Sequence, residues 1–332
     1  MSKKNQKKSN VKSSILVLLL IAILLIASTY AWFTANTKVT ISTLDVNVKA
    51  QNGLQISADG ADWKTILQNT DIDPTNVSKT YSGNTNQIPS IMEPVSSVGK
   101  IATDGTMEMF YGTVTQSDAG TSQLTASKTT DTKGAGDKAG QYIVFDTFLR
   151  VDADSQLTLT AESNVKAKEE ANSKGLENAA RVAFCVLGNT STGDTLSNIQ
   201  ALNDTAKATS YIWEPNYDVH TSAAINNAKN VYNITTTKGP DATKLDYNGI
   251  KAAITTPVAL NSNNAESFSQ VTTIPTKKAM TDTAILNLKA GITKVRIYMW
   301  VEGQDVDCEN SASGSDIQYN IQFSIPSPTP EI

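Results

Sequence analysis

Residues 317–325 alternate between apolar and polar side chains, and this alternation is the feature that most constrains the fold. The apolar set is Ile317, Tyr319, Ile321, Phe323 and Ile325, and the polar set between them is Gln318, Asn320, Gln322 and Ser324. Successive side chains of a β-strand point to opposite faces, so a period of two places all the apolar residues on one face. The sequence therefore predicts a half-buried antiparallel strand here.

The same period recurs along the chain. In "KVRIYMWVEG" it places Val295, Ile297, Met299 and Val301 on one face and Arg296, Tyr298, Trp300 and Glu302 on the other. The stretches "YIVFDTFLRV" and "QLTLTAES" also alternate, while "AARVAFCVLG" is apolar on both faces and is typical of a central strand. No amphipathic helices alternate with these strands. We therefore predict an all-β fold, an antiparallel β-sandwich of the jelly-roll kind with inserted loops and short helices.

Three segments lack this pattern. Residues 113–140 are polar and aperiodic, and we expect a loop there. Residues 188–265 mix strand-like and helix-like fragments, including Ala223 to Ile234, and are a possible insertion in a sandwich domain of residues 32–325. Residues 326–332 form a proline-rich tail. A chain of 332 residues is long enough for one or two domains.

The N-terminus carries a targeting signal. Lysines in residues 1–12 precede the apolar run Ile15–Ala27, and small and polar residues follow. This order is typical of a signal peptide, here residues 1–31 with cleavage between Ala31 and Trp32. Alternatively, residues 13–33 stay attached as a hydrophobic helix that anchors the chain in the membrane, since a span takes about 20 residues. Under both interpretations the lysines stay in the cytoplasm and the rest of the chain is exported. The protein is then either secreted or on the cell surface, or a single-pass membrane protein with a cytoplasmic N-terminus.

In the stretch after the apolar run, the apolar residues of the alternating pattern shift from odd to even positions. Val39 and Ile41 share one parity, whereas Leu44 and the valines after it share the other, so a bulge or a break between two strands must lie near residues 42–43. Residues 32–41 thus form a separate short segment that contains Trp32 and Phe33. Such a segment can fold back onto its own chain or complete the sheet edge of a neighbour. We expect self-association through Trp32, Phe33, Val39 and Ile41.

At this point the sequence resembles a known family. The lysines, the leucine-rich core, "AWF" at residues 31–33 and "TLD" at residues 43–45 are similar to the TasA/camelysin family of Gram-positive exported proteins. The likeness covers about residues 12–50. It implies removal of the leader by a dedicated signal peptidase and a role in biofilm-matrix fibres or spore coats.

Composition and motifs argue against several other functions. The net charge is -4, and beyond the first twelve residues there is no basic stripe, which excludes nucleic acid as an expected partner. Neither a Walker loop nor a dinucleotide fingerprint occurs, so we predict no cofactor. His220 is the single histidine, which rules out an HExxH zinc site, although some relatives are described as metalloproteases. We interpret His220 as a surface-loop residue and the protein as non-enzymatic.

Acidic residues raise two possible functions, calcium binding and hydrolysis. Asp305, Asp307 and Glu309 stand at alternate positions and are candidate calcium ligands, but the loop lacks the glycine and distant glutamate of an EF-hand and also suits an ordinary turn. A hydrolase could use Glu162, Asp305 or Glu302.

The sequence contains two cysteines, Cys185 and Cys308. They are permitted to pair in an exported protein, yet two buried free thiols, with Cys185 in a strand, satisfy the sequence equally well.

Overall fold

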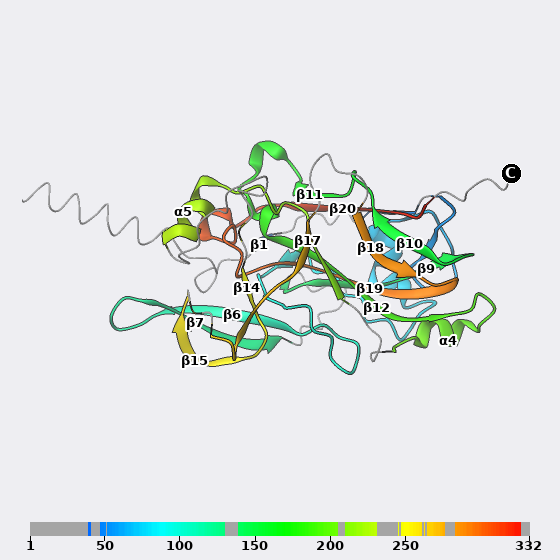
Figure 1. The fold of residues 1–332 in the computed structure, drawn as a ribbon, viewed down its shortest axis with the longest axis horizontal. Coiled ribbons are helices and arrows are strands. Elements are labelled where there is room, and N and C mark those ends of the chain that lie inside the picture. Colours follow the sequence, from blue (N-terminus) through cyan, green and yellow to red (C-terminus); the bar gives the residue numbers. More distant parts are fainter. Residues whose placement is uncertain are drawn as a thin grey trace, which may run out of the picture.

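The computed structural model describes residues 39–40, 47–50, 52–129, 139–204, 210–230, 245, 247–260, 262, 264–275 and 283–326. Most of its ordered elements are strands, and most strand pairs are antiparallel. The prediction of a mainly β fold with antiparallel sheets is confirmed (Figure 1). The predicted hydrophobic helix within residues 1–33 lies outside the described residues.

Two six-stranded sheets form the body of the molecule. The first, here called the terminal sheet, has the order β18 (Thr283–Leu288), β10 (Ser155–Leu159), β20 (Ile317–Ser324), β2 (Asn47–Ala50) and β4 (Ile66–Leu67), and β11 (Asn164–Ala167) also pairs with β20. The second, the long-strand sheet, has the order β17 (Thr273–Pro275), β13 (Ser210–Glu214), β12 (Ala180–Thr190), β19 (Gly291–Val301), β9 (Ile143–Val151) and β3 (Gln55–Ser57).

The main core lies between these two sheets. It contains Val48, Ile321 and Phe323 from the terminal sheet together with Phe184 and Ile297 from the long-strand sheet. The rings of Phe184 and Phe323 meet edge to face with centroids 5.7 Å apart. The apolar sides of the alternating strands therefore face one shared interior, as the period of two predicts.

The outer face of β19 is buried as well. Tyr298 and Trp300 point away from the main core into a second cluster with Met107 and Met109. Every residue of β19 is buried. Alternation thus identified the two faces of this strand but not the layer that covers the second one.

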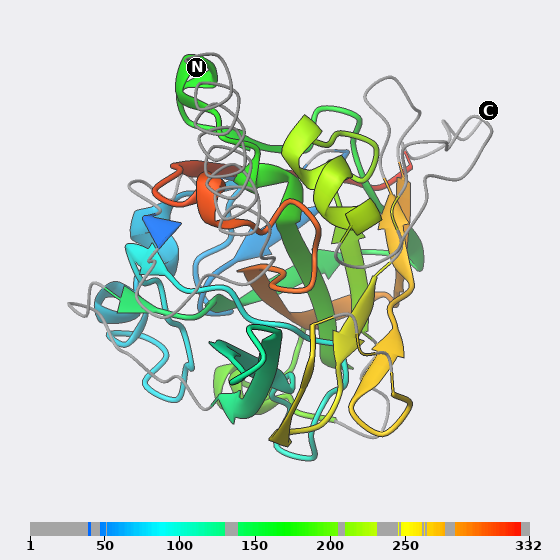
Figure 2. The ribbon, with the colours of Figure 1, turned by 90° about the vertical axis from the view of Figure 1, so that its left-hand side faces the viewer.

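Smaller sheets supply that layer and the periphery. They are β15 (Ile254–Ala259), β7 (Ser122–Thr129) and β6 (Met109–Gln116) in one sheet, β14 (Asn248–Ile250) with β16 (Phe268–Gln270) in another, and β1 (Val39–Thr40), β5 (Ile91–Met92) and β8 (Ala139–Gly140) in a third. In Figures 1 and 2, β6, β7 and β15 lie beneath the larger sheets. Together with β14 and β16 they enclose a core of their own around Phe110, Leu124 and Phe268.

The loop predicted over residues 113–140 is therefore wrong for much of its length. Residues up to Gln116 belong to β6, and Ser122–Thr129 form β7. On the buried face of β7, Leu124 lies between the small residues Ser122 and Ala126, so the apolar signal is weak. Within segment 188–265, residues Ser210–Glu214 form β13 of the long-strand sheet.

The helices are short. They are α2 (Asn69–Ile72), α3 (Pro74–Val77), η1 (Glu170–Asn172), η2 (Leu176–Ala179), α4 (Leu196–Ala201), α5 (Ser222–Asn230) and η3 (Asn310–Ala312). The start of α3 follows from its sequence: Asp73 accepts hydrogen bonds from the backbone N–H groups of Thr75 and Asn76, and Pro74 occupies the first position. None of the helices in the described ranges combines the length and apolar character that a membrane span requires.

Candidate functional site

The segment expected to direct assembly is described only at Val39–Thr40, which form β1. β1 pairs antiparallel with β5, Val39 opposite Met92 and Thr40 opposite Ile91. On its other side β5 pairs in parallel with β8. Ala31, Trp32, Phe33 and Ile41 lie outside the described residues. This part of the opening stretch therefore folds back onto its own chain through a contact of two residue pairs.

β2 begins at Asn47 in a different sheet from β1. Val48 of β2 is fully buried in the main core, and Met92 of β5, which pairs with Val39, is also fully buried. Residues 39–40 are thus held weakly by β5, and residues 47–50 are held more extensively by the terminal sheet.

The acidic turn after β19 is buried rather than exposed. Asp305 forms an ion pair with Arg181, Asp307 contacts His220, and Glu309 accepts a hydrogen bond from Ser311 at 2.8 Å. Each candidate calcium ligand thus already has a partner inside the protein. Within the described parts of the chain, no three His, Cys, Asp or Glu side chains have an arrangement that could hold a metal ion.

Arg181 is the centre of this buried group. Its Nη2 donates to Glu214 Oε1 at 2.7 Å and to Asp305, while its Nη1 donates to the carbonyls of Asn178 and Ala180 at 3.2 and 3.0 Å. The guanidinium also lies 5.0 Å from the ring centre of Tyr247. Burial works against its charge, yet Glu214 and the other surrounding groups outweigh burial and raise the pKa of Arg181. Burial raises the pKa of Asp305, and the neighbouring Asp307 raises it further, which together outweigh the lowering effect of Arg181.

The position of His220 also differs from the one expected from the sequence. Its side chain is only 5% exposed, and its Nδ1 lies 2.5 Å from Asp307 Oδ2. The other oxygen of Asp307 accepts the backbone N–H of Thr221 at 3.1 Å. The surface-loop interpretation is therefore wrong. The histidine joins the segment before α5 to the acidic turn, a contact between residues far apart in the sequence.

Glu302 lies at the end of β19 and is fully buried. One oxygen accepts from Trp300 Nε1 at 3.0 Å and from the backbone N–H of Ser97 at 3.3 Å, and the other accepts the backbone N–H of Gln304 at 3.1 Å. These donors favour the ionised form, but burial outweighs them and raises the pKa of Glu302 to about 7 from 4.5.

A pH dependence of stability follows from this pKa. Between pH 4.5 and 7 the folded protein keeps the proton on Glu302, whereas the unfolded chain releases it. The contribution of Glu302 to the free energy of unfolding is thus fully present below pH 4.5 and falls by about 3 kcal/mol as the pH rises to 7. Urea titrations across this range should show the fall in the wild type and a flatter profile in Glu302→Gln. Glu162→Gln, at an exposed site, should keep the wild-type profile. Parallel wild-type and Glu302→Gln profiles would contradict the assignment.

The hydrolase candidates do not form one exposed site. Glu162 lies in the exposed turn between β10 and β11, whereas Glu302 and Asp305 are buried at the far end of β19. Cys185 and Cys308 form no disulfide in the described structure, both are fully buried, and they belong to different core clusters. The prediction that Cys185 is a buried strand residue is confirmed.

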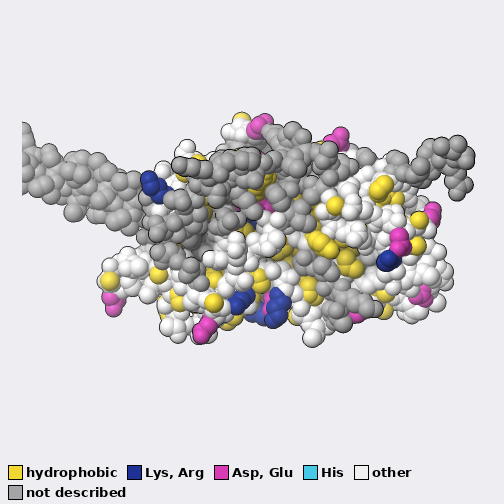
Figure 3. Space-filling view, in the orientation of Figure 1, with side chains coloured by type: hydrophobic (Ala, Val, Ile, Leu, Met, Phe, Trp, Pro, Cys, Tyr) yellow, Lys and Arg dark blue, Asp and Glu magenta, His cyan; other side chains and the backbone are white. Residues whose placement is uncertain are grey.

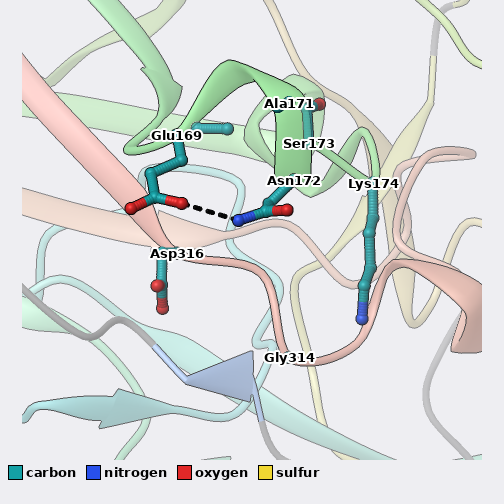
Figure 4. A pocket seen from close by; sticks show the side chains of 8 residues that line it. Glu169, Ala171, Asn172, Ser173, Lys174, Gly314 and Asp316 are labelled. Carbon is teal, nitrogen blue, oxygen red and sulfur yellow. Dashed lines mark hydrogen bonds between the residues drawn. The ribbon is translucent and has the colours of Figure 1, made fainter.

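A polar hollow of about 470 Å³ lies on the surface between η1 and the start of β20 (Figure 4). Glu169 accepts from Asn172 Nδ2 at 2.7 Å, and Lys174 Nζ donates to the Ser313 carbonyl at 2.7 Å. The lining offers carboxylate, amide and ammonium groups and more polar than apolar surface, unlike most small-molecule pockets.

A second buried charged group was missed by sequence reasoning. Asp146 of β9 accepts from Arg296 Nε at 2.7 Å and from the Tyr81 hydroxyl at 2.9 Å, and Lys294 Nζ lies 3.4 Å away. Burial alone would raise the pKa of Asp146, but Arg296 and Lys294 outweigh it and lower the pKa. The available signal was a charge of each sign within otherwise apolar strands, in "YIVFDTFLRV" and "KVRIYMWVEG".

One face of the molecule shows scattered charges. On the face shown in Figure 3, basic and acidic side chains are dispersed among neutral ones, without an extended patch of either sign. A comparison of the chain with protein-family models gives no match, and a comparison with curated proteins also gives none.

Proposed function

We propose that this chain is an exported, non-enzymatic structural protein of the cell surface or extracellular matrix that assembles by strand addition. In this proposal a signal peptidase cuts between Ala31 and Trp32, and residues 32–41 then pair with a neighbouring copy. The body is a β-sandwich of the jelly-roll kind, and a hydrophobic helix precedes it before cleavage. No cofactor takes part.

The observation that carries the proposal is the pairing of β1 with β5. Val39–Thr40 adopt strand geometry, and β5 offers an edge that accepts them. The contact within one chain comprises two residue pairs, so the same segment of another copy can compete for that edge with equal hydrogen bonding. A contact of this kind, repeated head to tail, does not close and yields filaments. The resemblance of residues 31–33 and 43–45 to TasA/camelysin proteins supports the same function.

The alternative is a membrane-tethered binding or adhesion module that retains residues 13–33. The hollow beside Glu169 and Lys174 favours it, because its hydrogen-bonding groups suit a polar ligand. In that case residues 39–40 serve only as the edge strand of the small sheet within their own molecule.

Deletion of residues 32–41 from a chain that starts at Trp32 tests the proposal. The shortened protein should remain folded, since Val48 and the terminal sheet are untouched, but it should neither polymerise nor seed the longer form. Size-exclusion chromatography and electron microscopy measure assembly, and circular dichroism measures folding.

Removal of residues 327–332 serves as the control and should leave assembly intact. If the chain from Trp32 stays monomeric at high concentration, or the shortened form assembles equally well, the tethered binding module becomes the better account.

A further inference from the structure

The strand nearest the N-terminus in the terminal sheet lies beside the last strand of the chain. β2 and β20 run parallel, and the register pairs Asn47 with Asn320, Val48 with Ile321, Lys49 with Gln322 and Ala50 with Phe323. Figure 1 shows β20, in red, leading towards the C-terminus at the right of the molecule.

Parallel pairing determines how a pull on the two ends acts on these strands. The N-terminal chain is attached at Asn47, the start of β2, and the C-terminal chain at Ser324, the end of β20. Because the strands point the same way, these attachment points lie at opposite ends of the ladder. A pull on the termini therefore slides the two strands past each other. The hydrogen bonds between the strands then bear the force at the same time rather than one after another.

The ladder is shielded from water and has neighbours on both sides. Val48, Ile321 and Phe323 are fully buried. β4 pairs with the outer side of β2, and β10 and β11 pair with the outer side of β20. Neither strand can move without breaking bonds on two sides.

Beyond the end of the ladder a side chain adds a further link. The Asn52 amide donates to Ser324 Oγ at 3.2 Å and to the Ile325 carbonyl at 2.8 Å. By contrast, β1 is joined to β5 by two residue pairs and would separate first under an N-terminal pull. The first substantial resistance is therefore the ladder of β2 and β20.

We propose that β2 and β20 form a mechanical clamp that resists unfolding when the protein is pulled through its two ends. This property belongs to the fold and stands whether or not the protein assembles by strand addition. It suits a chain that carries load between an attachment at its N-terminus and one at its C-terminus.

Single-molecule force spectroscopy on the full chain tests the clamp by comparing two pulling directions. The first uses handles at the N- and C-termini. The second keeps the N-terminal handle and places the other on Ser313→Cys, just before β20. The native thiols of Cys185 and Cys308 are fully buried, which leaves the introduced thiol for attachment.

In the second direction both handles pull at the same end of the ladder, because the start of β2 lies beside the first half of β20. Its bonds then break one at a time. At equal pulling speed we expect the unfolding force to be about twofold or more higher through the termini than through Ser313→Cys. Equal forces, or a lower force through the termini, would overturn the clamp.

Discussion

Replacing Arg181 by methionine should lower the free energy of unfolding by about 3–5 kcal/mol. The side chain is fully buried and neutralises Glu214 and Asp305, which are themselves buried. Methionine fills much of the same volume but leaves both carboxylates without their cation, and the carbonyls of Asn178 and Ala180 lose a donor. Urea denaturation monitored by tryptophan fluorescence measures the change.

Arg150→Met is the matched control. Arg150 is partly exposed, donates to the neutral Gln55 and stacks 4.4 Å from the ring centre of Trp63. Its loss leaves no buried charge without a partner, so we expect the free energy of unfolding to fall by about 1 kcal/mol. Arg181→Lys, which keeps the charge but not the planar fork, should lie between the two. Equal effects of Arg181→Met and Arg150→Met would contradict the central role of Arg181.

Asp146→Ala should also be strongly destabilising, again by about 3–5 kcal/mol. The carboxylate is fully buried and is the acidic partner of both Arg296 and Lys294. Without it the two buried cations, two positions apart on β19, lie side by side with no acidic partner, and the Tyr81 hydroxyl keeps only the Gln200 carbonyl as an acceptor. Thermal and urea unfolding measure the loss.

The control for Asp146 is Asp154→Ala. Asp154 pairs with Lys289 at 2.6 Å, but both side chains are more than half exposed, so water replaces the contact. We expect almost no change in stability. The interpretation of Asp146 fails if its replacement is as mild as that of Asp154.

Individual strands could be predicted well because their signal is local. In β19 and β20, alternation placed Ile297 and Phe323 on the interior face, where the structure has them. β12 was predicted to be central because both of its faces are apolar, and it lies between β13 and β19. The hairpin of β6 and β7 was missed, because small polar residues such as Ser122 occupy its buried face.

The candidate site could be predicted only in part. The acidic residues at 305, 307 and 309 were recognised as a group, but not their partners. Arg181 lies 124 positions from Asp305, and His220 lies 87 positions from Asp307. No periodicity in the sequence reports contacts at such separations, so an apparent exposed turn was in fact a buried ion-pair network.

The sequence by itself determined the main alternating strands and their interior faces, since a period of two acts between neighbouring residues. The tertiary structure decided which strands lie side by side, above all the parallel pairing of β2 with β20. It also decided that the outer face of β19 is covered and that its charges are paired within the protein. These outcomes depend on burial, which is a property of the packed chain: a charge in a strand meets its partner only once the layers around it exclude water.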